Sequence, residues 1–332
     1  MNRRGVIDRL LGLVDRPPAA LLAWSVLLSV ALIAMTHTIV WATGKAAVGS
    51  VLPDLIVPAV VSGYFVWFLV TLNRVARSSF NDFKPALGGD AMEEERFGES
   101  LTSVPDRLAI GSIIVAEVAI FSLYYGTVRP TRPAVDPVID VLTGFLWGIV
   151  AAAFAVVIIH TIRQLRLISR LSSLARNVDI FKPAPINAFA RLTALTATGI
   201  LVFEALFVLG NTDQPPTLVA QEVMFTLVAA ASFVLPLREM HNRLVAEKAL
   251  LVADGQDRLK TILGRLHSAV DANDLSRADQ LEKTLSSVLA EHEVLAKLPT
   301  WPWSTVTFRG FASALLVPVV IFVITQLIGR LL

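Results

Sequence analysis

Seven long apolar runs alternate with polar stretches along the chain. They cover residues 19–41, 53–72, 108–128, 138–160, 191–210, 218–236 and 310–329. Each is close to the roughly 20 apolar residues that an α-helix needs to cross a bilayer core of about 30 Å. The runs are apolar throughout and do not alternate over about ten residues, which favours helices over barrel strands. The pattern predicts an all-α polytopic membrane protein with seven transmembrane helices.

A long polar region, 237–300, separates the sixth run from the seventh. Apolar residues recur there at a helical period, break at Asp271–Asp274, and resume from Leu275. This predicts a coiled-coil-like helical hairpin whose first arm is about 50 Å long at 1.5 Å per residue. The predicted parts are an amphipathic N-terminal segment (1–18), a six-helix membrane region (19–236), the hairpin (237–300) and a last segment (301–332). The second and fourth helices of the membrane region are expected to extend into the cytoplasm.

Positive charge is distributed unequally about the predicted spans. If the N-terminus is placed inside, 25 of the 29 Lys and Arg residues lie on that side. The positive-inside rule therefore predicts a cytoplasmic N-terminus, and an odd number of spans places the C-terminus outside. We expect a multi-pass protein of the plasma (cytoplasmic, or inner) membrane with its hairpin in the cytoplasm.

The composition gives no sign of soluble enzyme chemistry. The chain is 55% hydrophobic and 17% charged, whereas a soluble domain carries about a quarter of charged residues. It has no cysteine, which excludes disulfides and thiolate metal sites. Walker, dinucleotide, Gly-x-Ser-x-Gly and His-Glu-x-x-His motifs are missing, and the five histidines lie far apart. We expect no enzymatic activity, no cofactor, no metal and no nucleic-acid partner.

Ionisable residues inside membrane spans are costly and usually functional; here they are His37, Glu117, His160, Glu204 and Glu222. Glu117 lies nearest the middle of the membrane, and the alternative to a functional role is a hydrogen-bonded acid that holds the bundle. His37 and Glu204 fall in the outer half, at the levels of Tyr124 and Trp147. A wet outer cavity would satisfy them, and so would local pairing with a hydroxyl or a histidine.

The last apolar run is entered through Trp301-Pro302-Trp303 and carries one strongly polar pair, Thr325-Gln326. A buried amide without partners costs a few kcal/mol, so Gln326 must face another helix or a pore. At helical spacing it belongs to a stripe of Val319, Phe322, Val323 and Gln326, bordered by Leu327. A polar ring beside a hydrophobic constriction can gate and select ions, whereas a helix–helix hydrogen bond is an equal alternative.

The span count, the orientation and the stretch Val323-Ile-Thr-Gln326-Leu327 resemble the seven-transmembrane ion channels that include insect odorant and gustatory receptors. The resemblance implies a homotetramer held together by cytoplasmic helices, with the seventh helix of each subunit lining a central cation pore. It implies a constriction at Val323 and Leu327 and a polar ring at Gln326, assisted by Thr325. It also implies an outer pocket for a small-molecule ligand, formed by His37, Tyr124, Trp147 and Glu204.

The chain departs from this family at two points. Val319-Val320 stands where the gustatory-receptor pattern has a Thr-Tyr pair, and the hairpin is longer than expected. Our leading hypothesis is a ligand-gated-type, cation-conducting homotetrameric channel in a lipid bilayer. The alternatives are a membrane-anchored scaffold that acts through the hairpin, and a proton-coupled small-solute transporter that uses Glu117 and Glu204.

Overall fold

The computed structural model describes residues 17–88, 91–123, 125–126, 136–176, 178–209 and 216–331. The helices are α2 (Pro18–Ala42), α3 (Pro53–Leu87), α4 (Ala91–Thr102), α5 (Asp106–Leu123), α6 (Pro137–Leu174), α7 (Pro183–Ile186), α8 (Ala190–Leu209), α9 (Pro216–Val234), α10 (Arg238–Asp271), α11 (Leu275–Lys297) and α12 (Thr305–Leu331). Within these described ranges no strand occurs, which confirms the all-α prediction. The predicted N-terminal segment, 1–18, lies outside the described residues except for its last two positions.

Five helical segments of the described chain are long and apolar enough to cross a membrane: α2, α3, α6, Pro183–Leu206 and Ala220–Asp271. They confirm a helical membrane protein. Helices α5 and α12 coincide with the third and seventh apolar runs, although the apolar stretch found in α12 is the shorter Thr305–Val317. The second and fourth runs continue as unbroken helix beyond residues 72 and 160, to Leu87 and Leu174.

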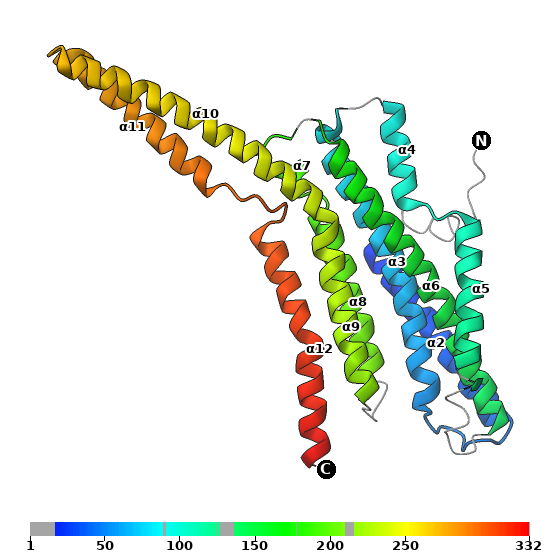
Figure 1. Ribbon diagram of the computed structural model, residues 1–332. Coiled ribbons are helices and arrows are strands. Elements are labelled where there is room, and N and C mark those ends of the chain that lie inside the picture. The colour runs from blue at the N-terminus through cyan, green and yellow to red at the C-terminus, as the bar shows by residue number, and fades with distance from the viewer. Residues whose placement is uncertain are drawn as a thin grey trace.

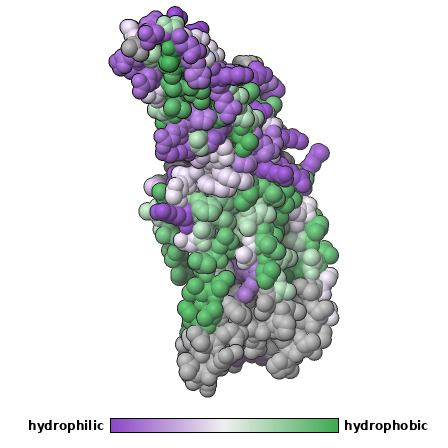
Figure 2. Space-filling view, turned by 60° about the vertical axis from the view of Figure 1, so that its left-hand side comes forward, coloured by the Kyte–Doolittle hydropathy of each residue, from purple (hydrophilic) through white to green (hydrophobic). Residues whose placement is uncertain are grey.

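The outer surface of the bundle is covered with large apolar side chains. Trp24 on α2, Val115 on α5 and Leu227 on α9 each expose more than half of their surface. Figure 2 shows hydrophobic residues over the middle of the molecule, while the hairpin and the adjoining end of the bundle are hydrophilic. A soluble protein rarely exposes apolar patches of this extent, so the surface is suited to lipid.

Helix α3 is the central element of the bundle, because α2, α6 and α8 all pack against it. Helix α5 packs on α6, and both α9 and α12 pack on α8 (Figure 1). Aromatic rings fill the centre, where Phe203 of α8 lies 5.0 Å from Phe65 of α3 and 5.1 Å from Phe154 of α6 between ring centroids. These contacts make α3 the scaffold on which the other helices are placed.

Two glycines allow helices to approach α3 closely. A Cβ atom on Gly63 would overlap Ser29 of α2 and lie 2.6 Å from the carbonyl oxygen of Ser25. A Cβ atom on Gly199 of α8 would overlap the ring of Phe68. Small residues at such crossings are typical of membrane helix interfaces, where close backbone approach supplies the packing.

Helices α9 and α10 are joined by a 3₁₀ turn, Leu235–Leu237, that contains Pro236. The chain thus leaves the bundle without a loop and continues as the first arm of the hairpin, which projects from the bundle in Figure 1. At the tip Asn273 adopts a left-handed φ of 57°, a conformation that asparagine tolerates. The Asp274 side chain then accepts the Arg277 N–H at 3.1 Å and caps α11. Helices α10 and α11 thus form two packed arms that reverse direction between Asp271 and Leu275.

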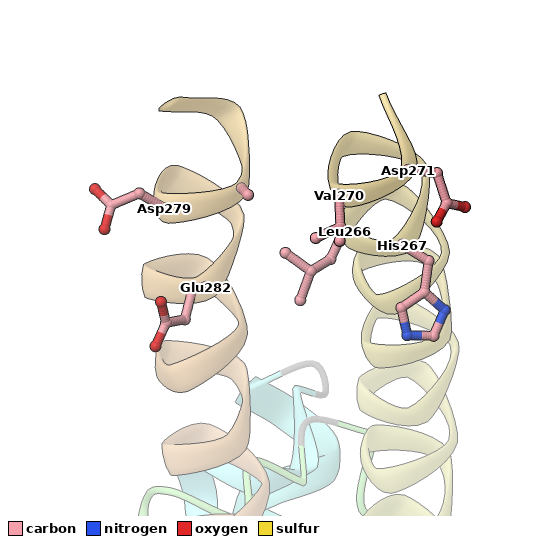
Figure 3. Close-up of a pocket in the computed structure, with 7 residues that line it drawn as sticks. Leu266, His267, Val270, Asp271, Asp279 and Glu282 are labelled. Atoms are coloured by element: carbon pink, nitrogen blue, oxygen red, sulfur yellow. The ribbon is translucent and has the colours of Figure 1, made fainter. Parts of the chain in front are cut away.

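The arms α10 and α11 pack against each other along the hairpin, and the space between them near the tip is a pocket of about 670 Å³. Leu266 and Val270 point into this space, whereas His267, Asp271 and Asp279 point away from it (Figure 3). Throughout the described residues, no group of three or more His, Asp or Glu side chains could hold a metal ion. The pocket is an open gap between the two arms whose lining also includes Ala278 and Glu282, and its polar side chains do not converge on one point.

Candidate functional site

A continuous stack of aromatic rings joins the hairpin to the start of α12. The His241 ring of α10 lies 3.9 Å from Trp301, and Trp301 lies 4.4 Å from Trp303, between centroids. Trp303 lies 5.1 Å from Phe233 at the end of α9. Phe233 is fully buried and lies 4.2 Å from Phe311 of α12. The Trp301-Pro302-Trp303 segment is thus a packed junction between α9, α10 and α12.

Two basic side chains of α10 fasten neighbouring helix ends to this junction. The Arg243 guanidinium donates to the backbone carbonyls of Ser173 and Ala175 at the end of α6. The Lys248 ammonium donates to two carbonyls at the end of α11, at 2.7 and 2.8 Å. Both cations donate to carbonyls that lack helical partners. Their positive charge also interacts favourably with the negative end of the helix dipole. Arg243 therefore ties the base of the hairpin to α6, and Lys248 ties its two arms together.

The predicted pore-lining residues lie in the C-terminal half of α12. This helix packs on α8 through Phe311, Ala314 and Leu315. Val319 and Val323 expose 55% and 47% of their surface, so about half of each side chain is left uncovered by the bundle. The other members of the predicted set have side chains outside the described residues: Phe322, Thr325, Gln326 and Leu327.

His37 of α2 holds the end of the α2–α3 loop through hydrogen bonds of its ring. Its Nε2 accepts the Leu52 N–H at 3.1 Å, so Nδ1 carries the proton and donates to the Ile33 carbonyl at 2.9 Å. Both ring nitrogens are satisfied by backbone groups, which fixes a neutral imidazole at the start of α3. The predicted role as a pocket residue has no contact to support it, since the ring is 4% exposed.

The other predicted pocket residues lie on several helices. Tyr124 is outside the described residues, and Trp147 of α6 packs against the main core. Glu204 lies on α8, which packs on a different face of α3 from α2, so the structure does not bring Glu204 next to His37. Because α3 stands between their helices, the predicted quartet does not form one described site.

Glu117 of α5 lies against Gly148 of α6. A Cβ atom built on Gly148 would lie 3.2 Å from one carboxylate oxygen of Glu117. The missing side chain at Gly148 therefore leaves room for the acid at the α5–α6 interface. Glu117 and Glu204 occupy separate helix interfaces.

Glu204 on α8 faces α9, and Glu222 on α9 faces α8. Glu204 extends the stripe Ala197–Leu201 of α8 that packs on α9 and α12, and it is 1% exposed. Glu222 lies seven residues before Ala229, on the same face of α9. The two acids therefore lie on facing sides of the α8–α9 interface. The sequence identified both acids as lying inside spans, but only the helix packing shows that they share one interface.

A buried polar network links α3, α4 and α6 at the end of the bundle nearest the hairpin. His160 Nε2 lies 2.5 Å from Asn73 Oδ1. The Gln164 amide donates to the same oxygen at 3.2 Å and to the Leu101 carbonyl at 2.9 Å. Asn73 and Gln164 were missed by sequence reasoning, although amides within apolar runs are a usable signal, because such groups seek partners across helices.

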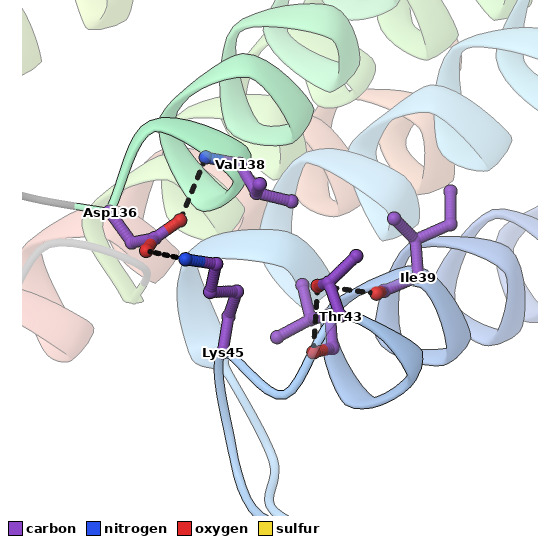
Figure 4. A network of polar contacts seen from close by, with 6 residues as sticks. Ile39, Thr43, Lys45, Asp136 and Val138 are labelled. Atoms are coloured by element: carbon purple, nitrogen blue, oxygen red, sulfur yellow. Dashed lines mark hydrogen bonds and ion pairs between the residues drawn. The ribbon is translucent and has the colours of Figure 1, made fainter.

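The opposite end of the bundle is closed by an ion pair. Lys45, in the loop after α2, lies 3.0 Å from the Asp136 carboxylate, which also accepts the Val138 N–H at 2.9 Å and caps α6 (Figure 4). The Lys45 hydrogen bond, followed by that of the Val138 N–H, lowers the pKa of Asp136 below its ordinary value. This contact fixes the α2–α3 loop to the start of α6.

No family model matches the chain, and no curated protein or solved structure matches it either.

Proposed function

We propose that the chain is one subunit of an ion channel in which α12 lines the pore. The observation that carries the proposal is the aromatic stack from His241 to Phe311, which connects the hairpin directly to α12. Helix α12 packs mainly on α8 and leaves its other face open, with Val319 and Val323 exposed. An exposed apolar helix face beside an assembly domain is suited to contact with further copies or to a lumen.

In this proposal the apolar helices make seven spans. The positive charges place the N-terminus and the hairpin in the cytoplasm, with the C-terminus outside, in the plasma membrane. The hairpin assembles four copies, and the seventh span of each copy contributes Val323 and Leu327 to a constriction. Gln326 forms a polar ring near the outer mouth, and cations permeate. A small-molecule ligand gates the pore.

The decisive experiment measures ionic current through the purified protein in planar bilayers. Gln326→Ala is expected to change conductance or selectivity because it removes the polar ring. Gln280→Ala, at an exposed position of α11, is the matched control and should leave the current unchanged. Absence of current from the wild type, together with monomeric mass in detergent, would refute the proposal.

A scaffold function is the second candidate, and one observation favours it. The hairpin exposes Leu250, Val270 and Leu289 to 68%, 57% and 49%. These side chains are suited to binding a helix of a different protein. Deleting residues 244–294 separates the two proposals: a channel subunit loses its oligomeric state and its current, whereas a scaffold loses a cytoplasmic partner while remaining a monomer throughout.

A further inference from the structure

Glu204 is a carboxylate enclosed by apolar helices. Its side chain is 1% exposed, and neither carboxylate oxygen has a hydrogen-bond partner among the described residues. The helix positions before it on the same face, Ala197 and Leu201, are buried in an apolar cluster. Glu204 therefore lies in the part of the bundle where an ion has the least solvation.

Among the described residues, the groups that face Glu204 offer it no positive charge. On α9 (Pro216–Val234), the one titratable residue is Glu222, a second acid. On α12, the described side chains packed on α8 are the apolar Phe311, Ala314 and Leu315. On α3, the Tyr64 hydroxyl is already committed, because it donates to the Gly199 carbonyl at 2.6 Å.

An ionised Glu204 would be very unfavourable in these surroundings. An isolated carboxylate in an apolar medium lacks the solvation it has in water, and a second carboxylate nearby adds repulsion. A metal ion would need several further oxygen ligands, whereas a proton needs only the carboxylate itself. With no cation among the described residues to pair with it, the acid is neutralised most simply by a proton.

We propose that Glu204 is a proton-binding site, protonated at neutral pH, and that Glu222 exchanges the proton with water. Glu222 is half-buried and lies nearer the end of the bundle away from the hairpin. The Glu222 carboxylate takes a proton from a hydronium ion and leaves a water molecule. When side-chain rotation brings the two carboxyl groups into contact, the proton passes on: an O–H bond forms at Glu204 as the Glu222 O–H bond breaks. No electron transfer is involved.

Loss of this proton would place a negative charge between α8, α9 and α12. Water would be drawn into the interface, and the packing of α12 on α8 would weaken. If α12 lines a pore, proton occupancy of Glu204 sets how firmly the pore helix is held. Only this last consequence depends on the proposed channel function.

The test is infrared spectroscopy of the protein reconstituted in lipid, with the pH raised stepwise from 7. We expect the carbonyl stretch of a protonated carboxylic acid at pH 7, and we expect Glu204→Gln to remove that band. Glu117→Gln, which changes an acid at another helix interface, is the control and should leave the band in place. A band that persists in Glu204→Gln, or no such band in the wild type, overturns the proposal.

Glu222→Gln provides a second measurement that does not require Glu204→Gln to fold. Removing the neighbouring negative charge makes ionisation of Glu204 easier, so the Glu204 band should disappear at a pH lower by on the order of one unit. An unchanged midpoint would show that the two acids do not interact and would refute the exchange role of Glu222. The readout is independent of ionic current, so failure of the channel proposal would leave it intact.

Discussion

Replacing Gly63 by alanine tests how closely α2 approaches α3. In the native structure Ser29 Oγ donates to the Ser25 carbonyl at 3.2 Å, and both groups lie over Gly63. An added methyl group would overlap the Ser29 hydroxyl and would lie 2.6 Å from the Ser25 carbonyl oxygen. The hydroxyl can rotate to another rotamer. The carbonyl is part of the α2 backbone, so the helices must move apart.

The size of the effect follows from two losses and one gain. Forcing an extra methyl group into a packed interface costs about 1–3 kcal/mol. Alanine gains about 1 kcal/mol over glycine in a helix interior. Separation of the helices also loses close Cα–H···O contacts, each contributing about 0.5–1 kcal/mol. We therefore expect Gly63→Ala to lower the free energy of unfolding by about 1–2 kcal/mol.

The assay is unfolding by SDS in mixed micelles, with the midpoint as the readout. Gly111→Ala in α5 is the matched control, because a Cβ atom at Gly111 meets no described atom within 4 Å. The control should keep or raise the midpoint, whereas Gly63→Ala should lower it. If both variants raise the midpoint equally, the close crossing of α2 and α3 is wrong.

Three further predictions concern the hairpin and the end of the bundle away from it. Gly255→Ala should raise hairpin stability by about 1 kcal/mol, measured by thermal melting, because the new Cβ atom meets only His292 Nδ1, at 3.9 Å; a loss of stability would contradict this packing. Lys248→Met should cost about 1 kcal/mol and speed amide hydrogen exchange in the last turn of α11, whose carbonyls it leaves uncapped; unchanged exchange would refute the cap. The pKa of Asp136 is lowered by Lys45, so the stabilisation from this pair is complete above the unfolded value of about 4 and is lost as pH falls through the folded pKa. The SDS midpoint of wild type should therefore fall in acid more than that of Asp136→Asn, and equal slopes would count against the ion pair.

The helical membrane architecture was predictable because hydrophobic length is a local property. The runs that contain α2, α3 and α6 were located to within a few residues at their starts, since Pro18, Pro53 and Pro137 occupy first helical positions. The hairpin was predictable for the same reason: its apolar period and its break at 271–274 are both local. What could not be predicted is which face of each helix meets which neighbour.

His37 illustrates that limit. Its position inside an apolar run predicted a functional group. In the structure, however, both ring nitrogens are hydrogen-bonded to the backbone, one to the Leu52 N–H and the other to the Ile33 carbonyl. The Leu52 contact depends on the path of the α2–α3 loop, which no periodicity specifies. Asn73 and Gln164 show the same limit, because their hydrogen bond joins positions 91 residues apart. Glu204 was identified as a buried acid from its span alone, but its relation to Glu222 required the packing of α8 on α9.

Because the 3₁₀ turn at Pro236 joins α9 to α10, any tilt of α10 at this turn would be amplified along the length of the hairpin. Helix α10 has 34 residues, and at 1.5 Å per residue its tip lies about 50 Å from the turn. A tilt of about 5° at the turn would therefore displace the tip by about 4 Å. The stacked rings of Trp301 and Trp303 lie beside this turn, between α10 and α12. A small rotation of α10 at the turn would shift the aromatic rings that pack against α12. A force applied at the tip of the hairpin would be larger at these rings, because the arm is long compared with the distance from the turn to the rings.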